Sequence, residues 1–330
     1  MLLRIPILLA LTASAAFAIS EENVKQTYNA GAGGNLVVDV NFGTIDVASA
    51  ADDKVSIDIH REIDTNNEET EKQFLTESPI ELKQDGNTVR ITARRISEKS
   101  WHWTGNVRMD AKFTVRVPKK FNLDLRTGGG TVLASDVEGT TKISTSGGKL
   151  KLAQLRGPLD AHTSGGSIAM SDCEGTLDVK TSGGEIRSET GGGKLDARTS
   201  GGAIVVRDFK GDATVKTSGG GLKFENVTGK VFGATSGGSI SAALVSPLSG
   251  DVELTSSAGS IELSVPADAK LNLQATAHNG RVSNSLPITA SHEEKDALEG
   301  VMNGGGKSVV LRASVGSISL RPAPAKTAMH

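Results

Sequence analysis

The chain has 330 residues, of which 37% are hydrophobic and only 3% aromatic, with 39 glycines, one cysteine and a formal net charge of −2. This charge excludes the strongly basic surface that nucleic-acid binding needs, and a single cysteine excludes a disulfide framework within one chain. Because aromatic side chains supply much of the buried area of large globular cores, the composition favours a regular, mainly aliphatic core.

The first segment, residues 1–18, predicts a signal peptide. One arginine precedes a short apolar run, and Ala16-Phe17-Ala18 has the small-x-small pattern of a cleavage site. The apolar run is shorter than the roughly 20 residues that a membrane-spanning helix needs, and no later segment qualifies as a span. We therefore expect export of a chain that begins at Ile19, to the periplasm, the cell surface or the medium.

Residues 19–120 form a predicted N-terminal β region. NFGTIDV (Asn41–Val47) reads as a turn followed by a strand, and VRMDAKFTVRVP (Val107–Pro118) is strand-like. Between them, TNNEETEKQFLTES begins at Thr65 with a T-x-x-E capping box, which predicts a short helix.

Both tryptophans of the chain, Trp101 and Trp103, lie in the segment SWHWTG. A large exposed aromatic side chain often marks a binding surface, so the pair are candidate ligand contacts, for example a platform for a sugar ring. The alternative, which we prefer, is that they cover an open end of the fold.

Residues 121–262 contain a strict repeat of 18 residues. TSGG recurs at Thr145, Thr163, Thr181, Thr199, Thr217 and Thr235, and TGGG stands at Thr127. A second glycine keeps the same interval at Gly139, Gly157, Gly175, Gly193, Gly211 and Gly229. Within each unit apolar and polar residues alternate, as Leu177 and Val179 do with Asp178 and Lys180, which predicts strands with one buried face.

We interpret each unit as one coil of an all-β, single-stranded β-solenoid (β-helix) rather than as a stacked hairpin. Equivalent residues would then form columns with a spacing of about 4.8 Å. Glycine pairs suit the corners because glycine permits φ > 0 and close approach of neighbouring backbones, and the corner threonine can pass hydrogen bonds along the stack. The predicted corner residues are Gly147, Gly148, Gly165, Gly166, Gly183, Gly184, Gly201, Gly202, Gly219, Gly220, Gly237 and Gly238.

Residues 263–321 are predicted to form degenerate coils, and residues 322–330 a disordered tail. The repeat loses its interval at SPLSGDV from Ser246, which carries a three-residue insertion. SHEEKDALEG, from Ser291 to Gly300, has an S-x-x-E box and predicts a second short helix. The two helical insertions, one near each end, are candidates for covering the open ends of the solenoid.

No catalytic, cofactor or metal site is predicted. Calcium-binding repeats need GGxGxD, which is absent, and the nearest turn column is interrupted by Gln and Thr; its members are Asp136, Gln154, Asp172, Thr190, Asp208 and Asn226. Stacked carboxylates such as Asp178 resemble a glycan-cleaving pair, but the basic column beside them favours a solvated, charge-balanced face. Cys173 shares an apolar column with Val137 and Phe209 and is expected in the core.

Three stretches resemble the bacterial "putative adhesin" family of exported β-solenoid proteins, a domain of unknown function. They are VRVPKKFNLDLRTGGGTV, the recurring TSGGxI corner followed by D-V-x-G, and GGGKSVVLRASVGSISL. The resemblance implies an exported β-solenoid at the cell surface or in the periplasm, and it supplies no catalytic residues.

We therefore expect a non-catalytic β-solenoid with a structural or adhesive role at the cell envelope, presenting repeated shallow surfaces that bind weakly and multivalently. The expected partner is an envelope or surface glycan or protein, without nucleic acid, cofactor or membrane span, and no particular oligomeric state is indicated. One alternative is a glycan-binding or carbohydrate-active β-helix that uses Trp101 and Trp103. Another is a regulatory protein that senses envelope stress.

Overall fold

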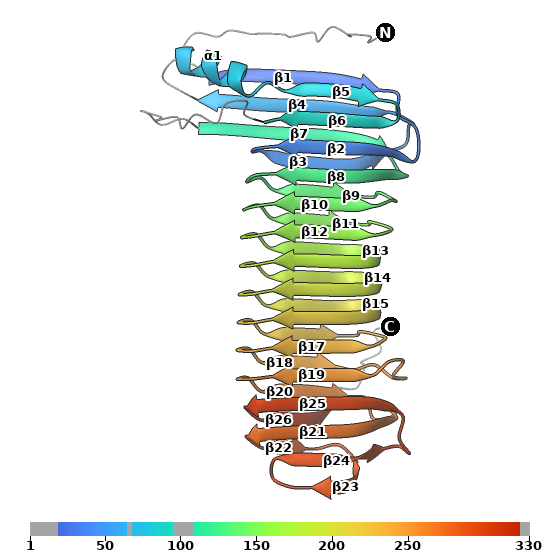
Figure 1. The fold of residues 1–330 in the computed structure, drawn as a ribbon. Coiled ribbons are helices and arrows are strands. Elements are labelled where there is room, and N and C mark those ends of the chain that lie inside the picture. Colours follow the sequence, from blue (N-terminus) through green and yellow to red (C-terminus); the bar gives the residue numbers. More distant parts are fainter. Residues whose placement is uncertain (1–18, 65–67, 95–107, 324–330) are drawn as a thin grey trace, which may run out of the picture. The chain divides into compact units, whose positions relative to one another are not determined.

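The computed structural model describes residues 19–64, 68–94 and 108–323 (Figure 1). The chain folds as two compact units, Met1–Ala161 and His162–His330. The predicted signal peptide and the SWHWTG segment with Trp101 and Trp103 lie outside the described residues, as do residues 324–330 of the predicted tail. Among the residues described, strands dominate both units, and the one helix is α1 (Glu68–Glu77). The helix predicted from Thr65 is thus confirmed.

The first unit contains two runs of paired strands. One run follows the order β1 (Ile19–Tyr28), β4 (Val55–Asp64), β7 (Arg108–Pro118), β3 (Thr44–Ala50), β9 (Val132–Ser135) and β11 (Leu150–Ala153). The other follows β5 (Glu81–Asp85), β6 (Thr88–Ala93), β2 (Gly34–Val40), β8 (Phe121–Thr127) and β10 (Thr141–Thr145). The pairs that include β1, β4 or β5 are antiparallel. All the other pairs in these two runs, which involve β2, β3 and the strands that follow them, are parallel.

Helix α1 packs against the inward side of β4. The ring of Phe74 lies 5.6 Å from the guanidinium carbon of Arg61 and 5.9 Å from the ring of Phe42. Arg61 is 1% exposed, since it lies on the same face of β4 as the buried residues Ile59 and Ile63. Its guanidinium forms an ion pair with Glu22 of β1 and donates a hydrogen bond of 2.7 Å to the carbonyl oxygen of Ser78. The N-terminal antiparallel strands and α1 are therefore held together by a buried charged group.

Strand β12 (Leu159–Thr163) spans the division between the units, and three long strands follow it: β13 (Ile168–Thr181), β14 (Ile186–Thr199) and β15 (Ile204–Thr217). Each pairs in parallel with the next in a register of one coil, so that Ile168 lies opposite Ile186 and Asp178 opposite Asp196. The same register continues from β14 to β15. Pairing of each residue with the one 18 positions later is the arrangement of a β-solenoid, and the predicted fold class is confirmed.

In later coils, two shorter strands, one on each side of the coil, replace the single long strand. They are β16 (Leu222–Glu225), β17 (Val231–Thr235), β18 (Ile240–Ala243), β19 (Val252–Ser256) and β20 (Ile261–Val265). Strand β15 pairs with both β16 and β17, because the single long strand of one coil faces two short strands of the next. Apolar side chains fill the interior in columns. Cys173, which is 1% exposed, lies in the core as predicted, in line with Phe209 two coils further on.

The last strands are β21 (Leu271–Asn279), β22 (Val282–Asn284), β23 (Thr289–Glu293), β24 (Ala297–Met302), β25 (Lys307–Val315) and β26 (Ile318–Pro322). The order along one side is β19, β25, β21, β24 and β23. Strand β25, which comes late in the sequence, therefore lies between the earlier strands β19 and β21.

The helix predicted for Ser291–Gly300 is wrong, because strands β23 and β24 occupy this segment. Strand β24 pairs antiparallel with β21 on one side and with β23 on the other. Its alternate residues Leu298 and Met302 are buried, which is the period of a strand. Backbone pairing with β21 and burial of these side chains outweigh one capping box, whose stabilising effect is about 1 kcal/mol.

Candidate functional site

The corner threonines are buried and form hydrogen bonds between coils. The hydroxyl of Thr181 donates to the carbonyl oxygen of Gly166 at 2.8 Å and accepts from the N–H of Gly184 at 3.3 Å. Thr199, Thr217 and Thr235 repeat both contacts, and Ser256 takes the same place one coil later. These hydroxyls are therefore part of the scaffold and are not displayed to a partner.

The predicted corner glycines lie in the bends between strands, but the two members of each pair differ. A Cβ atom on Gly184 would lie 1.9 Å from the carbonyl oxygen of Gly166, whereas one on Gly183 would lie 3.7 Å from that of Gly165. Close approach thus applies to the second glycine. The expectation of φ > 0 at these pairs is wrong: positive φ occurs in the other glycine column, for example 137° at Gly175 and 104° at Gly193.

The turn column that was weighed as a calcium site has left-handed backbone at every member. Asp136, Gln154, Asp172, Thr190, Asp208 and Asn226 have φ angles of 56°, 53°, 52°, 51°, 48° and 54°. Neighbouring members contact one another, as where the amide of Asn226 donates to Asp208 at 2.9 Å. In the described ranges, no three His, Cys, Asp or Glu side chains lie together as metal ligands do. Asp and Asn suit this column because they tolerate the left-handed conformation better than most residues.

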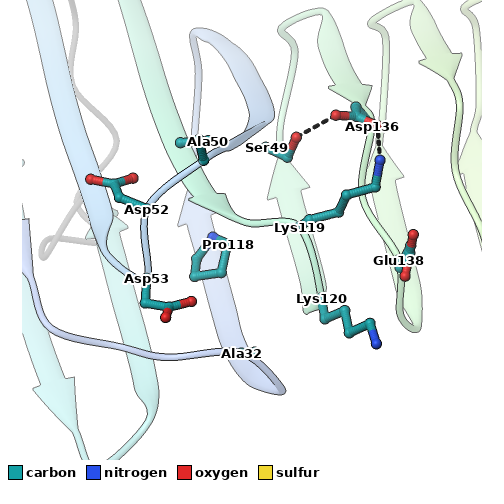
Figure 2. Close-up of a pocket in the computed structure, with 11 residues that line it drawn as sticks. Ala32, Ser49, Ala50, Asp52, Asp53, Pro118, Lys119, Lys120, Asp136 and Glu138 are labelled. Atoms are coloured by element: carbon teal, nitrogen blue, oxygen red, sulfur yellow. Dashed lines mark hydrogen bonds and ion pairs between the residues drawn. The ribbon is translucent and has the colours of Figure 1, made fainter.

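A hollow of about 610 Å³ in the first unit opens beside the first member of this column (Figure 2). We call it the Asp136 pocket. It is lined by Ala32, Ser49, Ala50, Ala51, Asp52, Asp53, Pro118, Lys119, Lys120, Asp136 and Glu138. The lining segments end and follow β3, end β7, precede β8 and follow β9, so the pocket lies where the N-terminal region meets the first regular coil of this unit.

Three side chains in the pocket are linked by hydrogen bonds. The Ser49 hydroxyl donates to one carboxylate oxygen of Asp136 at 2.5 Å, and the Lys119 ammonium donates to the other at 2.8 Å (Figure 2). The hydrogen bond from Lys119, followed by that from Ser49, lowers the pKa of Asp136. The same hydrogen bond between Lys119 and Asp136 raises the pKa of Lys119.

This linked group lacks the features of an activated nucleophile. A lysine with a raised pKa keeps its proton at neutral pH and is a poor general base. A carboxylate with a lowered pKa is likewise a poor base for the Ser49 hydroxyl. The side chains of Asp53, Lys120 and Glu138 have no hydrogen-bond or ion-pair partner in the part of the chain that the structure describes. The pocket therefore offers charges of both signs for contact with a polar ligand.

The outward faces of the coils carry mutually paired charges. Asp178 pairs with Lys180 at 2.9 Å and Asp196 with Arg198 at 2.6 Å, one coil apart. On the other side, the side chains of Glu185, Arg187, Glu189, Arg207, Glu225 and Lys223 form a chain of ion pairs. Water screens such exposed pairs, so each contributes little to the stability of the fold. This arrangement agrees with the solvated, charge-balanced face expected from the sequence.

Sequence reasoning singled out Asp136 only as a turn residue and did not single out Ser49, Lys119 or Lys120. One sequence feature could have pointed to this pocket: Pro118-Lys119-Lys120, just before the first coil, does not follow the repeat pattern. The partner Ser49 lies 87 residues from Asp136, and no local pattern connects the two.

The stacked coils define a parallel β-solenoid protein. The family model described as Toastrack DUF4097 matches residues 34–321, and the chain belongs to this family. This membership confirms the predicted resemblance to the "putative adhesin" family, a domain of unknown function. In the described ranges, α1 is too short and too polar to cross a bilayer, and no other helix qualifies.

Three solved structures are similar to the chain. A "putative cell adhesion protein" from Clostridium sporogenes is 10% identical, with a TM-score of 0.23 over 93% of this chain and 100% of the other. A "putative adhesin" from Bacteroides fragilis is 13% identical, with a TM-score of 0.32 over 90% and 96%. A "putative lipid binding protein" from Parabacteroides distasonis is 9% identical, with a TM-score of 0.27 over 90% and 96%. Comparison with the curated proteins gives no match.

Proposed function

We propose that this protein is exported and acts at the cell envelope as a non-catalytic, structural or adhesive solenoid. Its outward faces would present similar shallow surfaces coil after coil to an envelope or surface glycan or protein. Binding of this kind is weak at each contact and gains strength from the number of contacts made together.

The observation that carries the proposal is the one-coil register of the second unit. It places Asp178 opposite Asp196 and Lys180 opposite Arg198, so one arrangement of charges recurs on adjacent coils. A partner with its own repeat, such as a polysaccharide, can contact several coils at once. The linked group in the Asp136 pocket supports a non-catalytic role, because neither Lys119 nor Asp136 is poised as a base at neutral pH.

The test measures binding of the chain from Ile19 to His330 to immobilised envelope glycans, including peptidoglycan. Two variants are compared with it: a deletion of one whole coil, residues 182–199, and the double substitution Trp101→Ala/Trp103→Ala. We expect the coil deletion to shorten the residence time on the surface, since fewer contacts act together, and the tryptophan variant to bind as the parent does.

Loss of binding in the tryptophan variant alone would contradict the proposal. It would favour the alternative of a localised glycan-binding site at Trp101 and Trp103. Absence of binding to every glycan would exclude adhesion to these sugars and leave a structural or protein-binding role at the envelope.

A further inference from the structure

The strict interval of the repeat breaks in the second unit at Ser246-Pro247-Leu248, within the three-residue insertion. A hollow of about 620 Å³ lies at this break, and we call it the Lys270 pocket. It is lined by Ser246, Pro247, Leu248, Asp268, Lys270, Gly305, Gly306 and Lys307. In a repeat protein, a local departure from the shared pattern is where a specific function is expected, because stacking alone would preserve the interval.

The glycine-rich loop on one side of this pocket is held in a fixed shape. Asn303, Gly304 and Gly305 have consecutive positive φ angles of 53°, 83° and 82°. The side-chain amide of Asn303 donates to the carbonyl oxygens of Ala267 and Ala269, each at 2.9 Å. The amide of Asn272 donates to the carbonyl oxygen of Gly306 at 2.9 Å. The loop is therefore preorganised against the turn before β21.

This loop also presents a free backbone donor. The N–H of Gly305 donates to Met302 at 3.1 Å, whereas that of Gly306 makes no hydrogen bond within the residues that the structure describes. Successive backbone N–H groups in turns with positive φ form concave sites that suit anions. Glycine is needed at position 306, since a Cβ atom there would lie 2.3 Å from the carbonyl oxygen of Lys270 and clash with it.

Two lysines add positive charge at the same place. Lys270 immediately precedes β21, and Lys307 begins β25 opposite Leu271, so the two lysines come from adjacent strands. Both are exposed, and neither forms an ion pair with a described residue. This differs from Lys180 and Arg198 on the regular coils, which are paired with aspartates. Asp268 is the one acidic residue that lines the pocket, so the lining has a positive balance.

We propose that the Lys270 pocket binds an anionic group with exposed oxygen atoms, namely a phosphate, sulfate or carboxylate. Lys270 and Lys307 contact its charge, and the N–H of Gly306 donates to one of its oxygens. Pro247 and Leu248 provide an apolar wall for the carbon skeleton next to the anion. Such a mixture of an apolar wall and a few convergent polar groups is typical of small-ligand sites. The site is independent of the repeated faces, and it saturates at one ligand per chain.

The experiment titrates the chain from Ile19 to His330 with three probes: inorganic phosphate, a sulfated disaccharide and a galacturonic acid disaccharide. Binding is followed by calorimetry and by backbone amide NMR shifts. We expect at least one probe to saturate a single site and to shift the amide of Gly306. Comparison of the three probes identifies which of the three anions the pocket selects.

The variant Lys270→Gln/Lys307→Gln should weaken binding of that probe about tenfold or more, because two charge-assisted contacts are lost. The matched control Lys194→Gln/Lys210→Gln removes the same charge from exposed lysines of regular coils and should change affinity by less than about twofold. Asp268→Asn should tighten binding, since it removes the like charge from the lining. Equal weakening by the control pair, or no saturable binding of any probe, would overturn the proposal.

Discussion

At the residue scale, the second glycine of each corner is the position where the solenoid tolerates a side chain least. The two glycines of one corner have the same chemistry and are adjacent in sequence. They differ in what the neighbouring coil places against them. The carbonyl oxygen of Gly166 would lie 1.9 Å from a Cβ on Gly184, whereas a Cβ on Gly183 would have no atom beyond its chain neighbours nearer than 3.7 Å. This difference can be measured directly.

We expect Gly184→Ala to lower the free energy of unfolding by about 2–3 kcal/mol, since the backbone of one coil must move away from the next. Gly183→Ala should change it by about 0.5 kcal/mol or less, because its methyl group meets ordinary contact distances. Urea denaturation of the two variants and the parent tests this. Equal destabilisation by both substitutions would show that the corner needs glycine for conformational freedom instead of for space.

The Asp136 pocket predicts a pH dependence. The lowered pKa of Asp136 means that its carboxylate stabilises the fold above its unfolded-state pKa of about 3.9, and that this stabilisation is lost as the pH falls through the lower folded-state value. The raised pKa of Lys119 acts in the opposite direction: its contribution is present below its unfolded-state pKa and is lost as the pH rises through the folded-state value.

We therefore expect Asp136→Asn to lower the melting temperature at pH 7, and the difference from the parent to shrink as the pH falls below the unfolded-state pKa of about 3.9. Asparagine keeps the tolerance for positive φ, so the effect reports the charge. Asp208→Asn is the matched control, because Asp208 has a φ of 48° and forms no ion pair with a described residue. A difference for Asp136→Asn that stays constant with pH would contradict this account.

At the scale of elements, helix α1 depends on one charged side chain. Burial lowers the pKa of Arg61, while the charge of Glu22 and its hydrogen bond raise it. We infer that two contacts of Arg61 hold α1 over the core next to β4: its ion pair with Glu22 and its packing against the ring of Phe74. Removing one partner of such a buried pair leaves the other charge without compensation.

Arg61→Leu should therefore destabilise the first unit by about 3 kcal/mol, and the amides of α1 should lose protection from hydrogen exchange. The double variant Arg61→Met/Glu22→Gln removes both charges and should recover most of that loss. If the single and the double variants are equally unstable, the contribution of Arg61 is its packing on Phe74 and not its charge.

At the scale of the whole molecule, each coil of the regular repeat contacts mainly its two neighbours, so its stability is a sum of similar interfaces. Deleting residues 182–199 joins Thr181 to Ser200 and restores a TSGG corner in the same register. We expect this variant to fold with an unchanged circular-dichroism spectrum per residue and a small decrease in melting temperature. Deleting only residues 182–190 shifts the register by half a coil and should abolish cooperative unfolding.

The sequence by itself determined the coil, its 18-residue length, the buried columns and the place of the corners. This was possible because each coil packs on a copy of itself, so a pattern within one unit already specifies its long-range contacts. Cys173 illustrates the point: its column in the sequence predicted its place in the core. The T-x-x-E box likewise located α1, since capping is a local interaction.

Only the tertiary structure decided what depends on contacts between unlike segments. Ser49 reaches Asp136 across 87 residues, and Lys270 and Lys307 line one pocket because β25 pairs with β21. Pairing with β21 also made Ala297–Met302 a strand against its local helix signal. Stacking of the coils also made the two glycines of each corner differ, because a backbone carbonyl of the preceding coil lies close against the second glycine only. These features follow from which strand lies beside which, and the free energy of that pairing exceeds the local preferences of the residues involved.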